Sequence, residues 1–170
     1  KAAYADLMAA AHADAVHGAE ICRDLQDRLV MIARVSDAGA FVNTNALALK
    51  RSHGDYSVMQ LLYDGSEIKA VLDFVNAGEV PIGWELIRSY SYMDCPFNAA
   101  RLAAYTNESR RYAEVSMDDL RYMPYLYLGQ LLSSTYGYKQ YLQTGDEELL
   151  AFGRWRTEMC RYLIANAGEV

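Results

Sequence analysis

The sequence contains little cysteine and little proline, and it lacks the spacings that indicate a secreted or zinc-binding chain. Its 170 residues include three cysteines and three prolines. Cys22, Cys95 and Cys160 lie far apart, form no CxxC pair and are odd in number. A disulfide framework and a zinc site are therefore not expected, and a reducing, cytoplasmic environment fits this cysteine usage.

The chain also lacks long apolar runs and an excess of basic residues. No segment approaches the length of a membrane span, and no signal-peptide pattern opens the sequence, so we expect no membrane partner. The formal net charge of -6 argues against a nucleic-acid partner and is compatible with a cationic small substrate. The chain opens with Lys1, already in a helical pattern, and we expect it to be a piece of a longer protein.

Apolar residues and tyrosines are abundant. The apolar fraction of 52% is ample for a hydrophobic core, and the length corresponds to one domain or one lobe of a larger fold. Six of the 14 tyrosines lie between Tyr122 and Tyr141. We expect tyrosines in this stretch to pack in the core, and a cation–π pocket for a cationic ligand is the alternative.

Hydrophobic periodicity predicts helices in the first part of the chain and a small β unit after them. An Ala-rich helix is expected over residues 3–15, with Gly18 as a break. The next helix has a buried face at helical spacing, formed by Ile21, Leu25, Leu29 and Ile32. Residues 47–74 change to short alternating and apolar runs, with a hairpin turn at Asp64-Gly65.

The remaining residues are expected to be helical. Pro81 is placed in the first turn of a helix that ends near Tyr92, and Pro96 at the start of another. Capping boxes are predicted at Ser116–Asp119 and Thr144–Glu147, each at the beginning of a helix. The predicted fold class is therefore mainly α with a small β-hairpin unit.

The triplet His-Gly-Asp at residues 53–55 is the clearest candidate for a catalytic motif. Phosphoryl transfer needs one carboxylate beside the attacking hydroxyl and further ligands that hold magnesium against the phosphates. In protein kinases an Asn follows the catalytic-loop Asp by five residues, and a later Asp-Phe-Gly supplies a metal ligand. Here Gln60 is the fifth residue after Asp55, and Asp73-Phe74 follows the hairpin.

These motifs resemble the aminoglycoside phosphotransferase and choline kinase-like family. The resemblance lies in residues 53–62, 71–74 and 81–86; in the last of these the family often has Pro, an aromatic residue, an acid and Leu. It implies that residues 1–170 are the helical C-terminal lobe of a protein-kinase-like fold, with the N-terminal nucleotide lobe absent. It also implies phosphoryl transfer from ATP, with Mg²⁺ as cofactor, to a hydroxyl of a small-molecule acceptor that is aminoglycoside-like, choline-like or another small alcohol.

The resemblance further implies a role for each site residue. Asp55 falls on the catalytic base, Asp73 on the magnesium ligand, and Gln60 on a second metal ligand that is usually Asn. His53 and Glu85 would support the catalytic loop, with Glu85 in a position that the family usually fills with Asp.

Two alternatives remain open at this point. Gln60 and the unusual residues 57–59 also suit a kinase-like module that binds without catalysing. An unrelated α-helical interaction domain, with an accidental His-Gly-Asp triplet, would place Asp55 and Asp73 far apart, whereas the kinase-like hypothesis requires that both carboxylates face one cleft. The sequence does not identify the acceptor, because the motifs belong to the shared catalytic loop.

Overall fold

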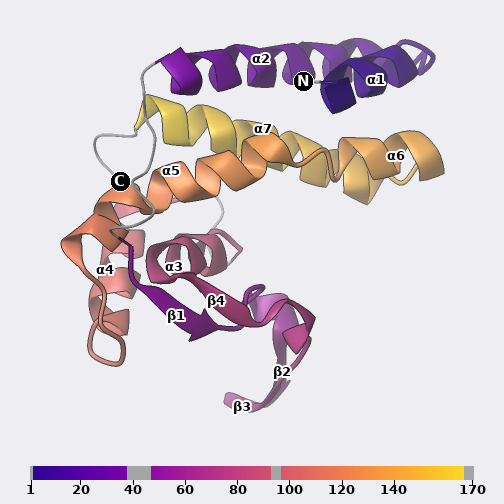
Figure 1. The fold of residues 1–170 in the computed structure, drawn as a ribbon. Coiled ribbons are helices and arrows are strands. Elements are labelled where there is room, and N and C mark those ends of the chain that lie inside the picture. Colours follow the sequence, from indigo (N-terminus) through magenta and orange to yellow (C-terminus); the bar gives the residue numbers. More distant parts are fainter. Residues whose placement is uncertain (1, 38–46, 93–96, 167–170) are drawn as a thin grey trace. The chain divides into compact units, whose positions relative to one another are not determined.

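Helices make up most of the residues that the structure describes, and two small antiparallel sheets accompany them there (Figure 1). A computed structural model describes residues 2–37, 47–92 and 97–166. Each sheet has two strands, so the predicted class, mainly α with a small β-hairpin unit, is confirmed. No helix within these three ranges is both long and apolar enough to cross a membrane.

The described residues divide into two units. The first, which we name the helical unit, comprises residues 2–37 and 128–166. The second, which we name the loop unit, comprises residues 47–92 and 97–127. Helix α5 (Met117–Ser133) contributes its first part to the loop unit and its last residues to the helical unit.

The helical unit is built from packed helices. They are the end of α5 together with α1 (Ala2–Ala11), α2 (Gly18–Asp37), α6 (Tyr138–Thr144) and α7 (Glu147–Ala165). Both α1 and α7 pack against α2 and α6. The four residues predicted to form the buried face of α2 all lie in the core or against it, so this prediction is confirmed. Cys22 and Cys160, both in this unit, are free thiols.

Helix α1 is shorter than the sequence predicts, because a capping carboxylate intervenes. The predicted helix over residues 3–15 ends at Ala11. Asp14 Oδ1 then accepts hydrogen bonds from two backbone N–H groups just before α2, at 2.8 Å each. A Cβ on Gly18 would lie 2.0 Å from the carbonyl oxygen of Ala11. Gly18 therefore begins α2 at a close approach of two backbones that only glycine permits.

One of the two predicted capping boxes is confirmed. The Ser116 N–H donates to Asp119 Oδ2 at 2.9 Å, and the Asp119 N–H donates to Ser116 Oγ at 3.0 Å. The second predicted box is wrong, because Thr144 ends α6 and Gly145 follows with a φ of 71°. Asp146 caps α7 instead, accepting the backbone N–H two residues further on at 2.9 Å.

The loop unit combines short strands with helices. Its strands are β1 (Leu49–Ser52), β2 (Leu61–Asp64), β3 (Glu67–Val71) and β4 (Gly78–Pro81). Its helices are α3 (Ile82–Ser91), α4 (Ala99–Ser109) and the first part of α5, with short 3₁₀ helices at η2 (Val58–Gln60) and η3 (Phe74–Asn76). Helix α3 packs against β1, β4 and α4.

Strands β2 and β3 form the predicted hairpin. Leu61 pairs with Val71 and Asp64 pairs with Glu67 in an antiparallel register. Gly65 has a φ of 60°, the left-handed conformation that a tight turn between such strands requires. The turn predicted at Asp64-Gly65 is therefore confirmed.

The pairing of β1 with β4 was not predicted from the sequence. Leu49 pairs with Pro81 and Ser52 pairs with Gly78. Glycine and proline are poor strand formers, so β4 carries no strand signal of its own. The pairing nevertheless places the turn at residues 53–56, which follows β1, beside the segment that leads into α3.

The structure agrees with one predicted helix start and leaves the other untested. Helix α3 runs from Ile82 to Ser91, close to the predicted bounds, although Pro81 is its N-cap residue and not part of its first turn. Pro96 and Cys95 lie outside the described residues. Helix α4 begins at Ala99, where the Asn98 side chain accepts the backbone N–H three residues further on at 3.0 Å.

Candidate active site

A buried glutamate fixes the turn that carries Asp55. Glu85 is 7% exposed and lies in the first turn of α3. The Gly54 N–H donates to Glu85 Oε2 at 2.9 Å, and the Tyr56 N–H donates to Oε1 at 3.0 Å. Hydrogen bonds from backbone amides to a carboxylate are charge-assisted and strong. The backbone on both sides of Asp55 is therefore held by a single carboxylate.

His53 connects this turn to the segment that contains Asp73. The imidazole Nε2 lies 2.6 Å from the carbonyl oxygen of Leu72, and Nδ1 lies 3.3 Å from the Asp55 backbone N. A carbonyl only accepts and an amide N–H only donates, so these partners require a neutral ring with its proton on Nε2. The ring also packs on Phe74, with 4.6 Å between ring centroids. His53 thus joins the two segments and has no nitrogen left for catalysis.

Gly54 brings the same two segments into close contact. Its φ is 77°, in the left-handed region that favours glycine. A Cβ at this position would lie 2.0 Å from the carbonyl oxygen of Asn76 in η3. The middle position of the His-Gly-Asp triplet therefore requires glycine, both because its φ is positive and because a side chain would clash with η3. The turn lies against η3 at this contact.

Asp73 has an unusual backbone conformation. Its φ of 58° and ψ of 64° lie in the left-handed region, where it is the only non-glycine residue among those described. Asp tolerates this region better than most residues, yet the conformation still costs about 1 kcal/mol. The exposed side chain forms no capping hydrogen bond with η3, which follows it. The carboxylate is therefore available to a ligand, and backbone strain of this kind is frequent at functional sites.

Asp55 forms an ion pair with Arg88, between Oδ1 and Nη2. The Asp55 side chain is 28% exposed, whereas the Arg88 side chain is 8% exposed. The guanidinium carbon lies 5.6 Å from the ring centroid of Trp84 and 5.3 Å from that of Tyr92. Arg88 Nη1 is buried and has no hydrogen-bond partner within the described part of the chain. The ion pair thus joins a partly exposed carboxylate to a buried guanidinium whose Nη1 donors are not used by the described residues.

Sequence reasoning missed Arg88, although a signal for it exists. Glu85 and Arg88 are three residues apart on α3, and such residues lie on one helix face. Once Glu85 is assigned to the turn, the same face brings Arg88 to that turn as well. That Arg88 would pair with Asp55 could not be predicted, because this ion pair depends on where the Asp55 side chain lies after folding.

The two predicted magnesium ligands, Asp73 and Gln60, both carry oxygen donors. The described residues contain no cluster of three or more His, Cys, Asp or Glu side chains that could hold a metal. Magnesium in nucleotide sites usually takes only one or two protein carboxylates and completes its shell with phosphates and water. A carboxylate and an amide oxygen are donors of the type that such a site uses, and the assignment of Asp73 and Gln60 as magnesium ligands stays a prediction. Gln60 is half-buried. Its backbone carbonyl oxygen accepts the Leu72 N–H at 2.8 Å, which connects Gln60 to the segment that contains Asp73.

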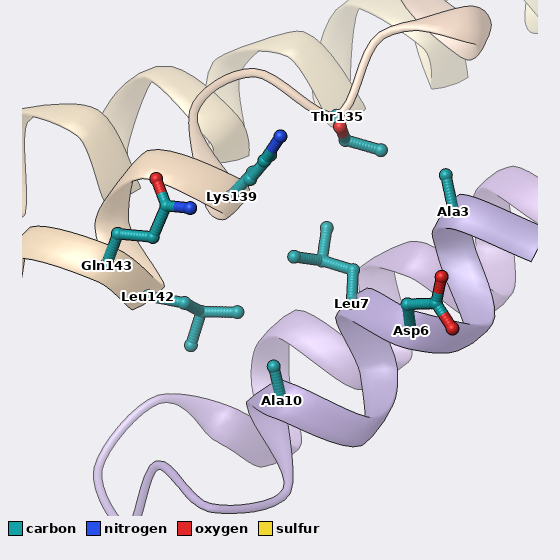
Figure 2. A pocket seen from close by; sticks show the side chains of 8 residues that line it. All are labelled: Ala3, Asp6, Leu7, Ala10, Thr135, Lys139, Leu142 and Gln143. Atoms are coloured by element: carbon teal, nitrogen blue, oxygen red, sulfur yellow. The ribbon is translucent and has the colours of Figure 1, made fainter.

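A separate pocket lies within the helical unit (Figure 2). Its volume is about 330 Å³, and its lining residues are Ala3, Asp6, Leu7, Ala10, Thr135, Lys139, Leu142 and Gln143. Leu7 and Leu142 provide apolar surface, while Asp6 and Lys139 contribute one charge of each sign. Neither of these two has an ion-pair partner among the residues that the structure describes. The pocket therefore has a mixed apolar and charged lining, and it includes none of the five residues predicted for the site.

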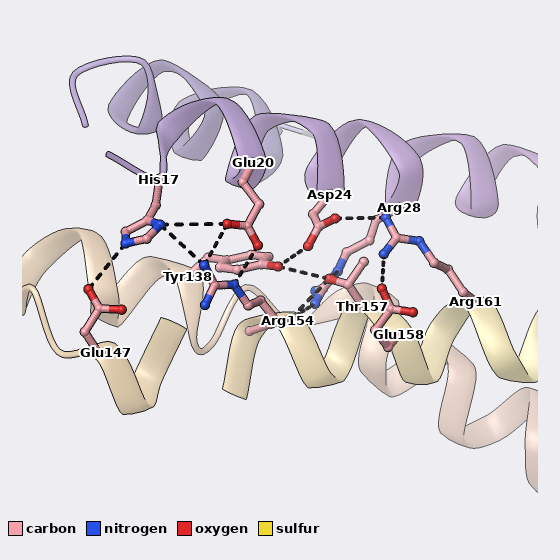
Figure 3. A network of polar contacts seen from close by, with 11 residues as sticks. His17, Glu20, Asp24, Arg28, Tyr138, Glu147, Arg154, Thr157, Glu158 and Arg161 are labelled. Atoms are coloured by element: carbon pink, nitrogen blue, oxygen red, sulfur yellow. Dashed lines mark hydrogen bonds and ion pairs between the residues drawn. The ribbon is translucent and has the colours of Figure 1, made fainter. Parts of the chain in front are cut away.

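A buried polar network also lies in the helical unit (Figure 3). Arg28 is fully buried and donates through Nε to Thr157 Oγ1 at 2.9 Å. Its two terminal nitrogens donate to the carbonyl oxygens of Ser134 and Gly153, at 3.1 Å each. Tyr138, also fully buried, donates its hydroxyl to Asp24, and burial raises the pKa of that hydroxyl well above its usual value. Each of these groups has a partner inside the protein, as expected of a structural network.

All five residues predicted for the site lie in the loop unit, and direct contacts join their segments. Glu85 holds the turn that contains Asp55, His53 contacts the residue before Asp73, and the Gln60 backbone bonds to the same residue. Comparison with protein-family models, curated proteins and solved structures gives no match to this chain. The function is therefore inferred from the geometry of the residues themselves.

Proposed function

We propose that the loop unit is the catalytic-loop region of a small-molecule kinase, and that the chain is the C-terminal lobe of a protein-kinase-like fold. The reaction would transfer the γ-phosphoryl group of ATP to a hydroxyl of a small molecule. One observation carries the proposal: a single buried carboxylate, Glu85, holds the backbone on both sides of Asp55. An ordinary surface loop does not require a buried carboxylate that fixes its backbone. This turn has one, and His53 also joins it to the segment that contains the strained Asp73.

Asp55 has the geometry of a base that positions the acceptor. Its side chain is partly exposed, while its backbone is fixed by Glu85 and His53. The acceptor hydroxyl would donate its hydrogen bond to the Asp55 carboxylate as its oxygen attacks the γ-phosphorus. The proton then passes to Asp55 while the bond between the γ-phosphorus and ADP breaks. Because the turn is fixed beforehand, little reorganisation accompanies the transfer.

Asp73 and Gln60 are the residues that would hold magnesium. The ion, when bound with the nucleotide, would neutralise charge on the phosphate oxygens. The left-handed backbone of Asp73 keeps its carboxylate out of the capping role that an Asp before a helical turn usually takes. Gln60 offers an amide oxygen in place of the Asn that the family uses.

A kinase-like binding module without catalysis is the second candidate. The ion pair of Arg88 with Asp55 favours it, because the pair occupies a carboxylate oxygen that a base needs. Under either candidate we propose a cytoplasmic protein whose ligand is a small-molecule hydroxyl compound, without a nucleic-acid or membrane partner.

The test uses the native protein that contains these residues. ATP consumption is measured with Mg²⁺ against a panel of small alcohols that includes an aminoglycoside and choline. Asp55→Asn is expected to lower turnover by at least about 100-fold, the usual minimum for loss of a general base, with nearly unchanged binding of Mg-ATP. Asp64→Asn is the matched control, because Asp64 is an exposed carboxylate at the hairpin turn of the same unit.

The outcomes separate the candidates. Equal turnover by Asp55→Asn and the native protein would refute the assignment of Asp55 as the base. Binding of Mg-ATP without turnover of any alcohol would favour the non-catalytic module. The absence of both binding and turnover would contradict both kinase-like candidates.

A further inference from the structure

We infer that the ion pair with Arg88 hinders Asp55 from acting as a base in the free protein, and that the preferred acceptor is an alcohol that also carries an oxyanion. This oxyanion pairs with the guanidinium of Arg88 and leaves the Asp55 carboxylate free to accept the proton of the acceptor hydroxyl. The inference rests on the proposed function and specifies its substrate class. Its starting observation is the ion pair between a buried guanidinium and the partly exposed carboxylate of Asp55.

Arg88 is held firmly in place. It lies on α3 one turn after Glu85, and its guanidinium faces the rings of Trp84 and Tyr92. Stacking on aromatic rings orients a guanidinium without using its N–H donors. The cation therefore stays beside the turn whether or not Asp55 remains paired with it.

The guanidinium has unused hydrogen-bonding capacity. Arg88 is only 7% exposed, and its buried Nη1 has no hydrogen-bond partner among the described residues. A buried donor without a partner is destabilising, and a ligand oxygen that reached it would remove that penalty. Carboxylate and phosphate oxygens match the guanidinium fork best, because two parallel N–H···O bonds can form.

Other charges at the turn do not offer the same capacity. Both carboxylate oxygens of Glu85 already accept backbone N–H groups. His53 uses both ring nitrogens and is neutral with these partners. Arg88 is therefore the group beside Asp55 that has donors to spare, and it repels an ammonium group that approaches the base.

Binding of an oxyanion explains how the same ion pair can belong to an active enzyme. While Oδ1 of Asp55 is paired with Arg88, the guanidinium fixes the orientation of the carboxylate and stabilises its negative charge, so the carboxylate is a weaker acceptor for the proton of the acceptor hydroxyl. When the oxyanion of the acceptor pairs with the guanidinium, Asp55 becomes free to accept the hydrogen bond of the acceptor hydroxyl. Neutral and cationic alcohols lack the group that makes this exchange, so they leave Asp55 paired with Arg88.

The experiment compares three alcohols of matched length with the native protein, Mg²⁺ and ATP. They are 3-hydroxypropanoate, 1,3-propanediol and 3-amino-1-propanol, which differ only in the group remote from one hydroxyl. We expect kcat/KM to fall in that order, with a step of at least about tenfold from the first to the second, as for loss of a charged hydrogen bond. Glycerol 3-phosphate beside glycerol tests whether phosphate replaces carboxylate, and a preference for either oxyanion supports the inference.

Substitution of Arg88 supplies a readout that a structural role would not give. Arg88→Met is expected to raise kcat for 1,3-propanediol, because the base is no longer paired, and to abolish the preference for 3-hydroxypropanoate. Arg88→Lys keeps the charge but not the fork, so it should retain a reduced preference. Equal loss of activity towards all three alcohols in a folded Arg88→Met protein would contradict the inference.

Failure of the inference is distinguishable from failure of the proposed function. If the native protein phosphorylates 3-amino-1-propanol as well as 3-hydroxypropanoate, the kinase assignment stands and the role of Arg88 is wrong. If the native protein phosphorylates no alcohol, the proposed catalysis is wrong and the inference falls with it. The comparison of acceptors needs only the native protein, so it is decisive even if Arg88→Met does not fold.

Discussion

The two units contain buried arginines in opposite situations. In the helical unit, Arg28 is fully buried, and its Nε and both terminal nitrogens have protein acceptors (Figure 3). In the loop unit, Arg88 is nearly as buried, but it pairs with the partly exposed Asp55 and leaves Nη1 without a partner among the described residues. The first arrangement is complete without a ligand, whereas the second is not.

The same contrast extends to the backbone. Asp14 and Asp146 accept the N–H groups at the starts of α2 and α7, as short carboxylates before helices usually do. Asp73 stands before a helical turn as well, yet it has left-handed dihedral angles and no capping bond. Local rules are therefore followed in the helical unit and broken around the Asp55 turn. Departures of this kind are expected where a sequence is selected for function.

Removal of each arginine tests the comparison most strongly. Arg28→Met should lower the free energy of unfolding by about 3 kcal/mol or more, since it leaves a buried hydroxyl and two carbonyl oxygens without their donor. Arg88→Met should lower it by no more than about 1 kcal/mol, because Asp55 can turn to water. Urea denaturation followed by circular dichroism measures both values. A larger loss for Arg88→Met would show that its ion pair is structural.

The glycine of the triplet provides the next largest effect. Gly54→Ala should lower the free energy of unfolding of the loop unit by about 3 kcal/mol, through a positive φ and a clash with Asn76. Gly65→Ala is the matched control, because its φ of 60° is similar but no atom lies within 4 Å of the added Cβ. We expect about 1 kcal/mol for the control. Equal losses would mean that the turn does not press against η3.

Glu85 connects the helix to the turn, and a smaller effect is expected there. Glu85→Gln keeps the size and one acceptor oxygen, but one of the two turn amides loses its charged partner. The bonds should weaken by about 1.5 kcal/mol, equivalent to roughly tenfold faster hydrogen exchange at the amides of Gly54 and Tyr56. Glu79→Gln, at an exposed position on β4, is the control and should leave these rates unchanged. Unchanged exchange in Glu85→Gln would contradict the bracing role.

Local signals predicted much of the fold correctly. The Asp64-Gly65 turn, the Ser116 capping box and the buried face of α2 each depend on residues close together in sequence. The pairing of β1 with β4 was missed because Gly78 and Pro81 have low strand propensity, and the pairing arises only from the tertiary fold. Thr144 fits the capping-box pattern because Glu147 follows it by three residues. Asp146 nevertheless caps α7, and Thr144 is the last residue of α6.

The site was partly predictable for the same reason. Residue types and spacing pointed to Asp55 and Asp73, whereas Glu85 enters only through the family resemblance; its carboxylate accepts the N–H groups of Gly54 and Tyr56. The spacing could not specify that Asp55 would pair with Arg88, because this contact joins positions that only folding brings together. Nor could it predict the left-handed backbone of Asp73. The catalytic and metal-binding roles themselves remain predictions.

Asp73 offers the smallest effect on stability and the sharpest test of the comparison. Asp73→Gly relieves a left-handed conformation, so it should raise the free energy of unfolding by about 0.5–1 kcal/mol. If the strain serves a metal site, the same change should weaken binding of Mg-ATP to the native protein. Urea denaturation and calorimetric titration measure the two quantities independently.

Asp73→Asn separates the two contributions. Asn also tolerates the left-handed region, so stability should stay close to that of the native protein, while the loss of the negative charge should weaken magnesium-dependent binding. A gain in stability for Asp73→Gly with unchanged binding in both variants would mean that the strained backbone serves no magnesium site. Weaker Mg-ATP binding in both variants, with a higher free energy of unfolding only in Asp73→Gly, would show that the Asp73 backbone is strained in order to bind a ligand. The capping aspartates of the helical unit carry no such strain.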